Sequence, residues 1–137
     1  YKAWRSHAFV EANERVCSMW SQPDKAQGKY TKRGEIFAFV THRPDVSNKV
    51  SFEIGYDFKP GVALEVKIDR ERYRLTTSGR TAWSDDAKTG EKMVRAMRAG
   101  KEMVVVGISK RGTKTTDTYS LSGFTAAHRA IGRACKQ

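Results

Sequence analysis

The sequence predicts a mainly β protein with a single domain over residues 1–137, and three observations support this. β-Branched and aromatic residues alternate with polar ones in short stretches, which Gly, Pro, Asn or Asp interrupt. A chain of 137 residues is long enough for one core that buries about two thirds of its unfolded surface. Hydrophobic residues make up 39% of the chain, which excludes wholesale disorder.

The first third of the chain predicts three strands and one loop. Tyr1–Phe9 and Val16–Ser21 flank a polar turn at Glu11–Glu14, and Ile36–Thr41 is a short apolar strand. Pro23–Lys32 contains Pro, Asp, Gln, Gly and Lys in close succession. We therefore expect an exposed loop there.

A half-buried strand is expected around residue 52, because Val50, Phe52 and Ile54 fall on one face. Lys59-Pro60-Gly61 then marks a turn, since Pro presets φ and Gly accepts a positive φ.

A β-hairpin is predicted next. Val62–Ile68 alternates in the same way, Asp69–Arg72 closes the hairpin, and Tyr73–Thr77 is the returning strand. The expected register places four side chains on one face: Leu64, Val66, Tyr73 and Leu75.

A helix of about three turns follows, capped by Asp85 or Asp86 and ended by Gly100. Its apolar stripe consists of Met93, Ala96 and Met97. The near-continuous apolar run Met103–Ile108 predicts a strand buried on both faces. A turn at Lys110–Thr113 leads to a last strand, Thr115–Leu121.

The chain is predicted to end in a second helix, which Thr125 would cap after Gly123. Its apolar positions follow helical spacing: Ala127, Ala130, Ile131 and Ala134. Cys135 lies one turn after Ile131, so the buried face of this helix would bring it against the body of the protein.

The chain contains two cysteines, Cys17 and Cys135, close to its opposite ends. They have no neighbouring Cys or His, so they fit neither a zinc cluster nor a CxxC redox site. One intramolecular disulfide would tie the second strand to the C-terminal segment. Such a bridge would imply an oxidising compartment outside the cytosol.

The charge is large and uneven. Lys and Arg number 26 against 15 Asp and Glu, a net charge of +11, of which +8 belongs to residues 69–137. This balance favours polyanionic partners: nucleic acid, anionic lipid headgroups, lipopolysaccharide or acidic proteins. An oxidising compartment favours the last three.

Two hairpins carry the cations that we select as an anion-binding or partner-binding site. Lys110, Arg111 and Lys114 lie at the tip of one hairpin, and the neighbouring hairpin carries the other three, Arg70, Arg72 and Arg74. The surrounding segment 107–115 lacks the Walker spacing, because Thr113 stands where a phosphate-binding loop has Lys.

Nothing in the sequence predicts a metal, a cofactor or a catalytic group. His7, His42 and His128 lack metal-ligand spacing, and no GxSxG motif is present. An enzyme of unrecognised class remains an alternative, which would require a carboxylate and a His to converge in a concave pocket, for example Asp117 with His42 or His128.

A basic nucleic-acid-binding domain is the other alternative, but nucleic acid is not the favoured partner. The nearest approach to an RNA-recognition signature, Ser122-Gly123-Phe124, lacks the basic residue and the second aromatic. Among the three tryptophans, Trp20 is expected to be the most exposed, because Cys17 and Met19 occupy the opposite face of its strand.

Six segments together resemble the invasion-associated locus B (IalB) family of periplasmic or secreted bacterial proteins. They are Trp4, Cys17 with Ser18–Pro23, Val62–Asp69, Ala82-Trp83, Met93–Gly100 with Met103–Val105, and Tyr119–Ala127, the most specific of the six. The resemblance covers nearly the whole chain. It implies an immunoglobulin-like β-sandwich, a Cys17–Cys135 disulfide, no enzymatic activity and a link to virulence through host-cell invasion.

We therefore expect a non-enzymatic periplasmic or secreted protein that binds an anionic envelope component or a partner protein. The longest apolar run, Met103–Ile108, is too short to cross a bilayer. The sequence opens at Tyr1 without an apolar leader, so we expect that a signal peptide has been removed.

Overall fold

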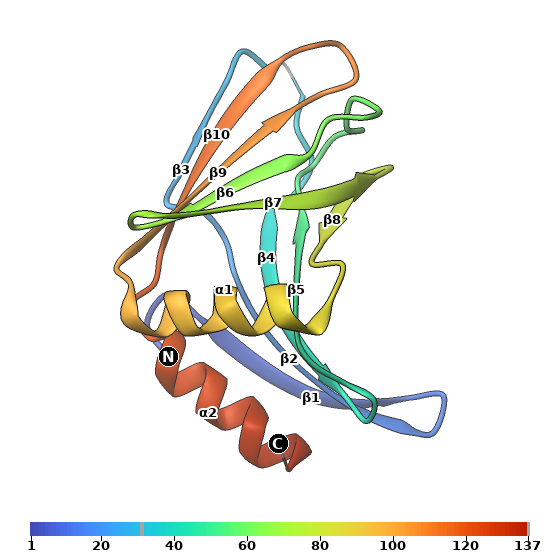
Figure 1. Cartoon of the computed structure of the whole chain (residues 1–137), viewed down its shortest axis with the longest axis vertical. Helices are drawn as coiled ribbons and strands as arrows, with labels where there is room; N and C mark the ends of the chain where they lie inside the picture. The colour runs from blue at the N-terminus through green and yellow to red at the C-terminus, as the bar shows by residue number, and fades with distance from the viewer. Residues whose placement is uncertain (31, 137) are drawn as a thin grey trace.

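The structure, a computed structural model, describes residues 1–30 and 32–136, and its strands form one ten-stranded antiparallel sheet (Figure 1). Along the chain the strands are β1 (Arg5–Glu11), β2 (Glu14–Ser21), β3 (Lys25–Gln27), β4 (Phe37–Arg43), β5 (Val46–Glu53), β6 (Leu64–Ile68), β7 (Glu71–Ser78), β8 (Thr81–Trp83), β9 (Glu102–Ile108) and β10 (Lys114–Ser120). In space their order is β1-β2-β4-β5-β8-β7-β6-β9-β10-β3.

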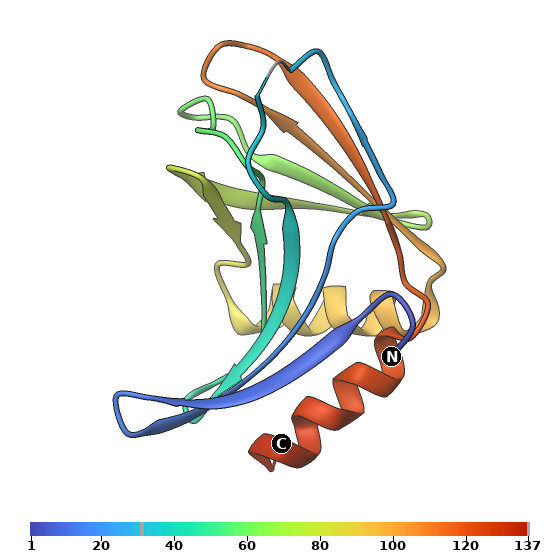
Figure 2. The ribbon, with the colours of Figure 1, turned by 180° about the vertical axis from the view of Figure 1, so that it is seen from behind.

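Strand β7 joins two leaves of this sheet. Its first half, Glu71–Leu75, pairs with β6, and its second half, Thr76–Ser78, pairs with β8. The first leaf consists of β1, β2, β4, β5 and β8, and the second of β6, β9, β10 and β3. The leaves diverge from β7 in both views (Figures 1 and 2).

Two helices cover the interior between the leaves. Helix α1 (Ala87–Ala99) packs against β5 and β6, one strand from each leaf, whereas α2 (Phe124–Cys135) packs against β1, β2 and β4. This arrangement confirms the prediction of a mainly β, sandwich-like protein with one mid-chain and one C-terminal helix. The largest fully buried side chains come from both leaves and both helices and include Trp4, Phe52, Leu64, Met97, Tyr119 and Phe124.

The predicted register of the β6–β7 hairpin is confirmed. Leu64 lies opposite Leu75, and Val66 lies opposite Tyr73. The predicted cap of α1 is confirmed as well, because the Asp86 side chain accepts a hydrogen bond from the Thr89 backbone N–H. Local patterns were sufficient for both features, since each depends on residues close in sequence.

Four details of the sequence prediction are wrong. The loop Pro23–Lys32, of which Thr31 lies outside the described residues, contains β3, whose side chains are all exposed and gave no apolar pattern. Strand β8 was missed because it has only three residues. One face of β9 is buried, but Val104 and Val106 on the other face are half-exposed. Helix α2 is preceded by Gly123 with φ 87°, where a side chain would collide with the Tyr1 carbonyl, rather than by a Thr125 cap.

Helix α2 is fixed to the first leaf at both ends. A disulfide joins Cys135 at its C-terminus to Cys17 on β2, at a sequence separation of 118, which confirms the expected bridge. At its N-terminus, the Trp4 ring packs edge-on against Phe124, and its indole N–H donates to the Ser120 carbonyl at 3.0 Å. The helix therefore closes the chain onto its first two strands.

A buried ion pair holds the inner face of β10. Both carboxylate oxygens of Asp117 accept hydrogen bonds from the Arg33 guanidinium, at 2.7 and 2.6 Å, and the Asp117 side chain is fully buried. The Arg33 guanidinium also lies 5.2 Å from the centre of the Tyr56 ring. Burial raises the pKa of Asp117, and the hydrogen bonds from Arg33 offset part of that rise.

Replacing Arg33 should destabilise the protein strongly, because it would leave a carboxylate buried without a partner. We expect Arg33→Met to lower the free energy of unfolding by about 3–5 kcal/mol in urea denaturation. The exposed ion pair of Arg43 with Glu11 is the matched control, and Arg43→Met should cost less than about 1 kcal/mol. The double variant Arg33→Met/Asp117→Leu should recover most of the loss. A small effect of Arg33→Met alone would contradict this interpretation.

Candidate functional site

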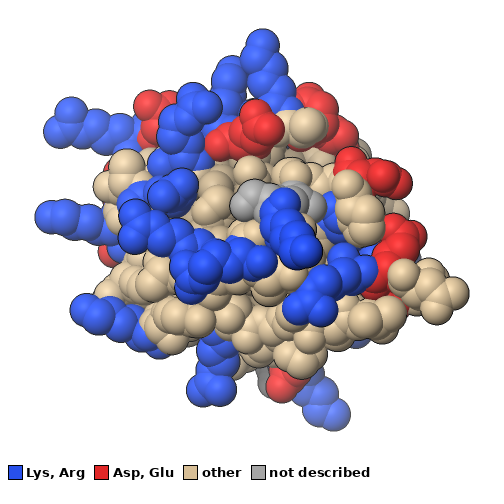
Figure 3. Space-filling view, turned by 90° about the horizontal axis from the view of Figure 1, so that it is seen from below, with Lys and Arg blue, Asp and Glu red and all other residues tan. Residues whose placement is uncertain are grey.

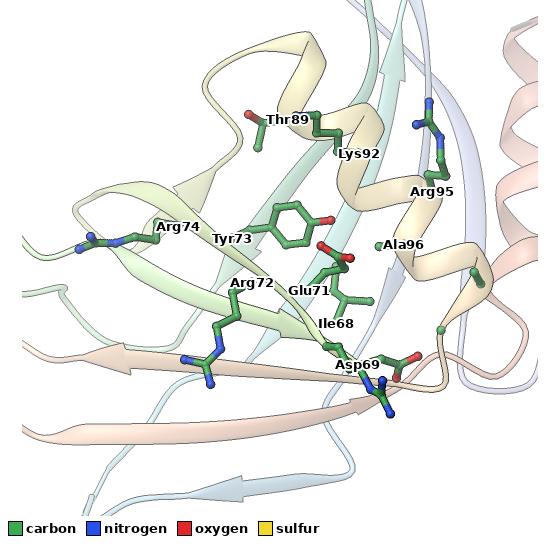
Figure 4. A pocket seen from close by; sticks show the side chains of 13 residues that line it. Ile68, Asp69, Glu71, Arg72, Tyr73, Arg74, Thr89, Lys92, Arg95 and Ala96 are labelled. Atoms are coloured by element: carbon green, nitrogen blue, oxygen red, sulfur yellow. The ribbon is translucent and has the colours of Figure 1, made fainter.

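A groove of about 1000 Å³ separates the β6–β7 hairpin from α1 (Figure 4). Tyr73 and Glu71 point from the hairpin toward the helix, where Thr89 and Lys92 lie. Burial and the nearby Glu71 carboxylate raise the pKa of the Tyr73 hydroxyl.

The structure divides the three arginines that were predicted to act together on this hairpin. All three are among the residues that line the groove, with Arg70 at the turn, but their side chains do not point the same way. Arg72 and Arg74 point away from α1 (Figure 4), opposite Lys67 and Glu65 of β6. The strand alternation that places Tyr73 on the inner face places these two arginines on the outer face of the second leaf.

The other predicted cations lie at the opposite end of the second leaf. Strands β6 and β9 are antiparallel, with Ile68 opposite Met103, so the turn after β6 meets the start of β9, whereas the tip Lys110–Thr113 follows its end. Lys110 and Arg111 line a depression of about 600 Å³ together with Arg80. The two predicted hairpins are therefore consecutive in the sheet but do not form one surface.

The largest concentration of positive charge lies on the two helices and the residues that flank their ends, which the sequence prediction did not select. Residues 87–101 and 123–136 carry eight Lys or Arg against one acidic residue, Glu91, a net charge of +7 out of the total of +11. Seen from the helices, Lys and Arg spread across this face, and most Asp and Glu lie toward its margins (Figure 3). We call this surface the basic helical face.

Helical spacing builds this face. Lys88, Lys92 and Arg95 follow one another at i, i+4 and i+7, on the side of α1 opposite its buried methionines. Helix α2 adds Arg129 and Arg133 beside Arg98 of α1, because the two helices touch where the Thr125 hydroxyl donates to the Arg98 carbonyl. The apolar stripe predicted for α1 could have revealed the basic face, because the side of the helix opposite that stripe must carry its charged residues, and most of these are Lys or Arg.

A pocket of about 700 Å³ lies between the two helices and the β4–β5 hairpin. Its basic wall consists of Arg98, Arg129, Arg133 and Lys136. Its floor contains two histidines that share Asn48. The Asn48 backbone N–H donates to His42 Nδ1 at 3.0 Å, and His128 Nε2 lies 2.7 Å from the Asn48 side-chain oxygen.

The position of Asn48 is set by close packing. Its φ of 57° lies in the left-handed region, which Asn tolerates better than most residues. Its carbonyl oxygen approaches Gly90 of α1 so closely that a side chain there would collide with it. Asn48 thereby connects the β4–β5 hairpin to both helices.

The family model of the Invasion associated locus B (IalB) protein matches residues 4–132. The chain belongs to the invasion-associated locus B family. The resemblance found in the sequence is thus confirmed. Neither the curated proteins nor the solved structures contain a match to this chain.

The structure of this IalB-family chain does not bring together Asp117 and the two histidines, which were named as one possible catalytic combination. Asp117 is bonded to Arg33 on the second leaf, whereas His42 and His128 are bonded to Asn48 beneath the helices. Within residues 1–30 and 32–136, no group of three His, Cys, Asp or Glu residues could hold a metal ion. Neither helix in the same residues is long and apolar enough to cross a membrane.

The buried His42 and the half-buried His128 should make this IalB-family protein less stable in acid. Burial lowers the pKa of His42, and burial together with the nearby His42 and Arg98 lowers the pKa of His128 to about 4. In the unfolded chain the two imidazoles take up a proton near pH 6.5, whereas in the folded protein His128 stays neutral down to about pH 4. The stability that the neutral imidazoles contribute is therefore complete above pH 6.5 and is lost as the pH falls toward about 4.

We expect the free energy of unfolding to decrease between pH 6.5 and about pH 4, and we expect His128→Gln to make this decrease smaller. Urea denaturation at a series of pH values measures it, with His7→Gln on the exposed face of β1 as the matched control. A His128→Gln profile as steep as that of the wild type would contradict the assignment.

Proposed function

We propose that this chain is a non-enzymatic, periplasmic or secreted binding protein and that its basic helical face binds an anionic component of the cell envelope or an acidic partner protein. The observation that carries the proposal is the concentration of net charge on α1 and α2. The disulfide supports an oxidising compartment, since such bridges form and persist outside the cytosol. A role of this binding in host-cell invasion is part of the proposal.

The helix cations are available to a partner. Within the described part of the chain, the ion pairs are Arg33 with Asp117 and Arg43 with Glu11, and neither involves a helix residue. Cations that face water without a carboxylate repel one another, and a polyanion relieves that repulsion while releasing its own counterions. The basic helical face therefore has the electrostatic properties of a polyanion-binding surface.

Some of the cations predicted from the sequence extend the basic helical face, and others form a separate surface. Arg70 lies at the end of the groove that Lys92 and Arg95 line, so it can contribute to the same partner. Lys110, Arg111 and Lys114 lie at the far end of the second leaf, and with Arg80 they offer a separate, smaller basic surface. We propose that binding depends mainly on the helices and less on this tip.

Two variants that each remove three positive charges should separate the surfaces. We expect Arg98→Ser/Arg129→Ser/Arg133→Ser to elute from heparin at lower salt than Lys110→Ser/Arg111→Ser/Lys114→Ser, although both have the same net charge. The slope of log affinity against log salt should fall by up to about 3 for the helix variant, because each lost contact releases about one counterion fewer.

The same pair of variants tests membrane binding by sedimentation with phosphatidylcholine vesicles that contain or lack phosphatidylglycerol. Thermal unfolding should be similar for both variants, since all six replaced side chains are exposed. Equal elution of the helix variant and the wild type would contradict the proposal. A larger loss with the tip variant would assign the binding site to the hairpin instead.

A further inference from the structure

The two edges of the sheet are protected to very different degrees. Strand β3 forms one edge; it has three residues, includes Lys25, and lies between Pro23 and Gly28. Short length, Lys and nearby Pro are the features by which proteins block pairing at an edge. Strand β1 forms the other edge with seven residues, and it contains neither Pro nor Lys. Its register with β2 is continuous from Arg5 to Glu11, without a bulge.

The backbone groups of β1 that face outward can be identified from the turn. Ala12 and Asn13 form a two-residue turn with φ of 50° and 65°, so Glu11 and Glu14 are a hydrogen-bonded pair. Hydrogen-bonded and non-hydrogen-bonded pairs alternate along an antiparallel ladder. The N–H and C=O groups of Ser6, Ala8 and Val10 therefore point away from β2. No hydrogen bond to them occurs in the described residues.

We propose that β1 is a dimerisation edge, at which a second copy of this chain pairs antiparallel to the first about a two-fold axis at Ala8. In this register Ala8 lies opposite the partner's Ala8, and Ser6 lies opposite the partner's Val10. Each of these pairs then exchanges both of its N–H···O=C bonds. All the outward groups of β1 are used, and Val10, whose side chain is 67% exposed, gains a neighbour.

Charge complementarity selects this register. Arg5 and Glu11, at the two ends of β1, come to lie opposite the partner's Glu11 and the partner's Arg5 on one face of the new sheet. Glu11 already lies 3.7 Å from Arg43 of its own chain, so its carboxylate would have a cation on either side. Moving the axis to His7 or Phe9 would shorten the paired stretch and break the Arg5–Glu11 contacts at both ends.

The outer face of the first leaf supports the same partner. Here His7 and Phe9 of β1 lie beside Trp20 and Phe39, around a mainly apolar hollow of about 450 Å³. The proposed pairing places His7 opposite the partner's Phe9 in a non-hydrogen-bonded pair, where side chains approach most closely. The half-exposed aromatic surface would then continue from one copy into the other.

The inner face leaves room for the second copy. Helix α2 lies beside β1 in both views (Figures 1 and 2), and its His128 flank faces β4. By helical geometry the opposite flank, toward β1, carries Ala126, Ala130 and Ala134. Small side chains on this flank of the helix allow the partner's α2 to approach, and Arg129 and Arg133 line the histidine pocket. The Arg15 side chain of β2 also reaches this flank, where its Nε–H donates to the Ala134 carbonyl at 2.6 Å.

Light scattering coupled to gel filtration tests the proposal through one substitution at the axis. The wild type should have twice the monomer mass of 15.5 kDa. Ala8→Pro removes an N–H that points outward and adds a ring at the edge, so the β1–β2 ladder is retained while the dimer should weaken at least about tenfold. Ala8→Ser keeps the N–H and should remain dimeric. Circular dichroism checks that both variants fold.

A complementation experiment tests the register. Arg5→Glu and Glu11→Lys each create like-charge pairs at both ends of the homodimer, so each variant alone should be monomeric. In an equimolar mixture the opposite charges face each other again, and a heterodimer should form. A wild type that stays monomeric at all concentrations would overturn the proposal. So would a dimer that Ala8→Pro leaves unchanged, or variants that fail to associate when mixed.

Discussion

Helix α2 is held against the first leaf at both ends, and the rest of the molecule depends on that attachment. The Cys17–Cys135 bridge fixes its last turn, and the Trp4 ring with its hydrogen bond to Ser120 fixes its first. Between them, Phe124 and Ile131 complete the core beneath β2 and β4. In the chain-entropy model, a bridge across so long a loop stabilises the fold by up to about 5 kcal/mol, comparable with the whole stability of a small domain.

The position of α2 also creates the two surfaces to which we assign interactions. It brings Arg129 and Arg133 beside Arg98 of α1, so cations from two separate segments form one basic face. That arrangement has an electrostatic cost, which core burial and the covalent bridge offset. The same placement turns the alanine flank of α2 toward β1, where the Arg15 side chain of β2 reaches the helix and donates to the Ala134 carbonyl.

The sequence was sufficient for features that depend on neighbouring residues and insufficient for those that depend on distant ones. The β6–β7 register and the Asp86 cap follow from local alternation and spacing. The Arg33–Asp117 pair spans 84 residues, and no local pattern indicates it. Strand β3 exists only because β10 lies beside it.

The candidate site shows the same limit. The basic second half of the chain was evident, but the hairpin arginines were chosen because they are close in sequence. Strand alternation sends Arg72 and Arg74 to the outer face of the second leaf, whereas helical spacing and the α1–α2 contact gather the larger set of cations. Which cations share a surface is a property of the tertiary fold, and family membership gave no further guidance on it.

The most direct test of this account is hydrogen–deuterium exchange of the native protein and of the Cys17→Ser/Cys135→Ser variant. If the bridge holds α2 in place, the α2 amides of the variant will lose most of their protection, while β9 and β10 of the second leaf will keep theirs under native conditions. Unchanged protection of α2 without the bridge would show that packing alone fixes the helix and would contradict the account.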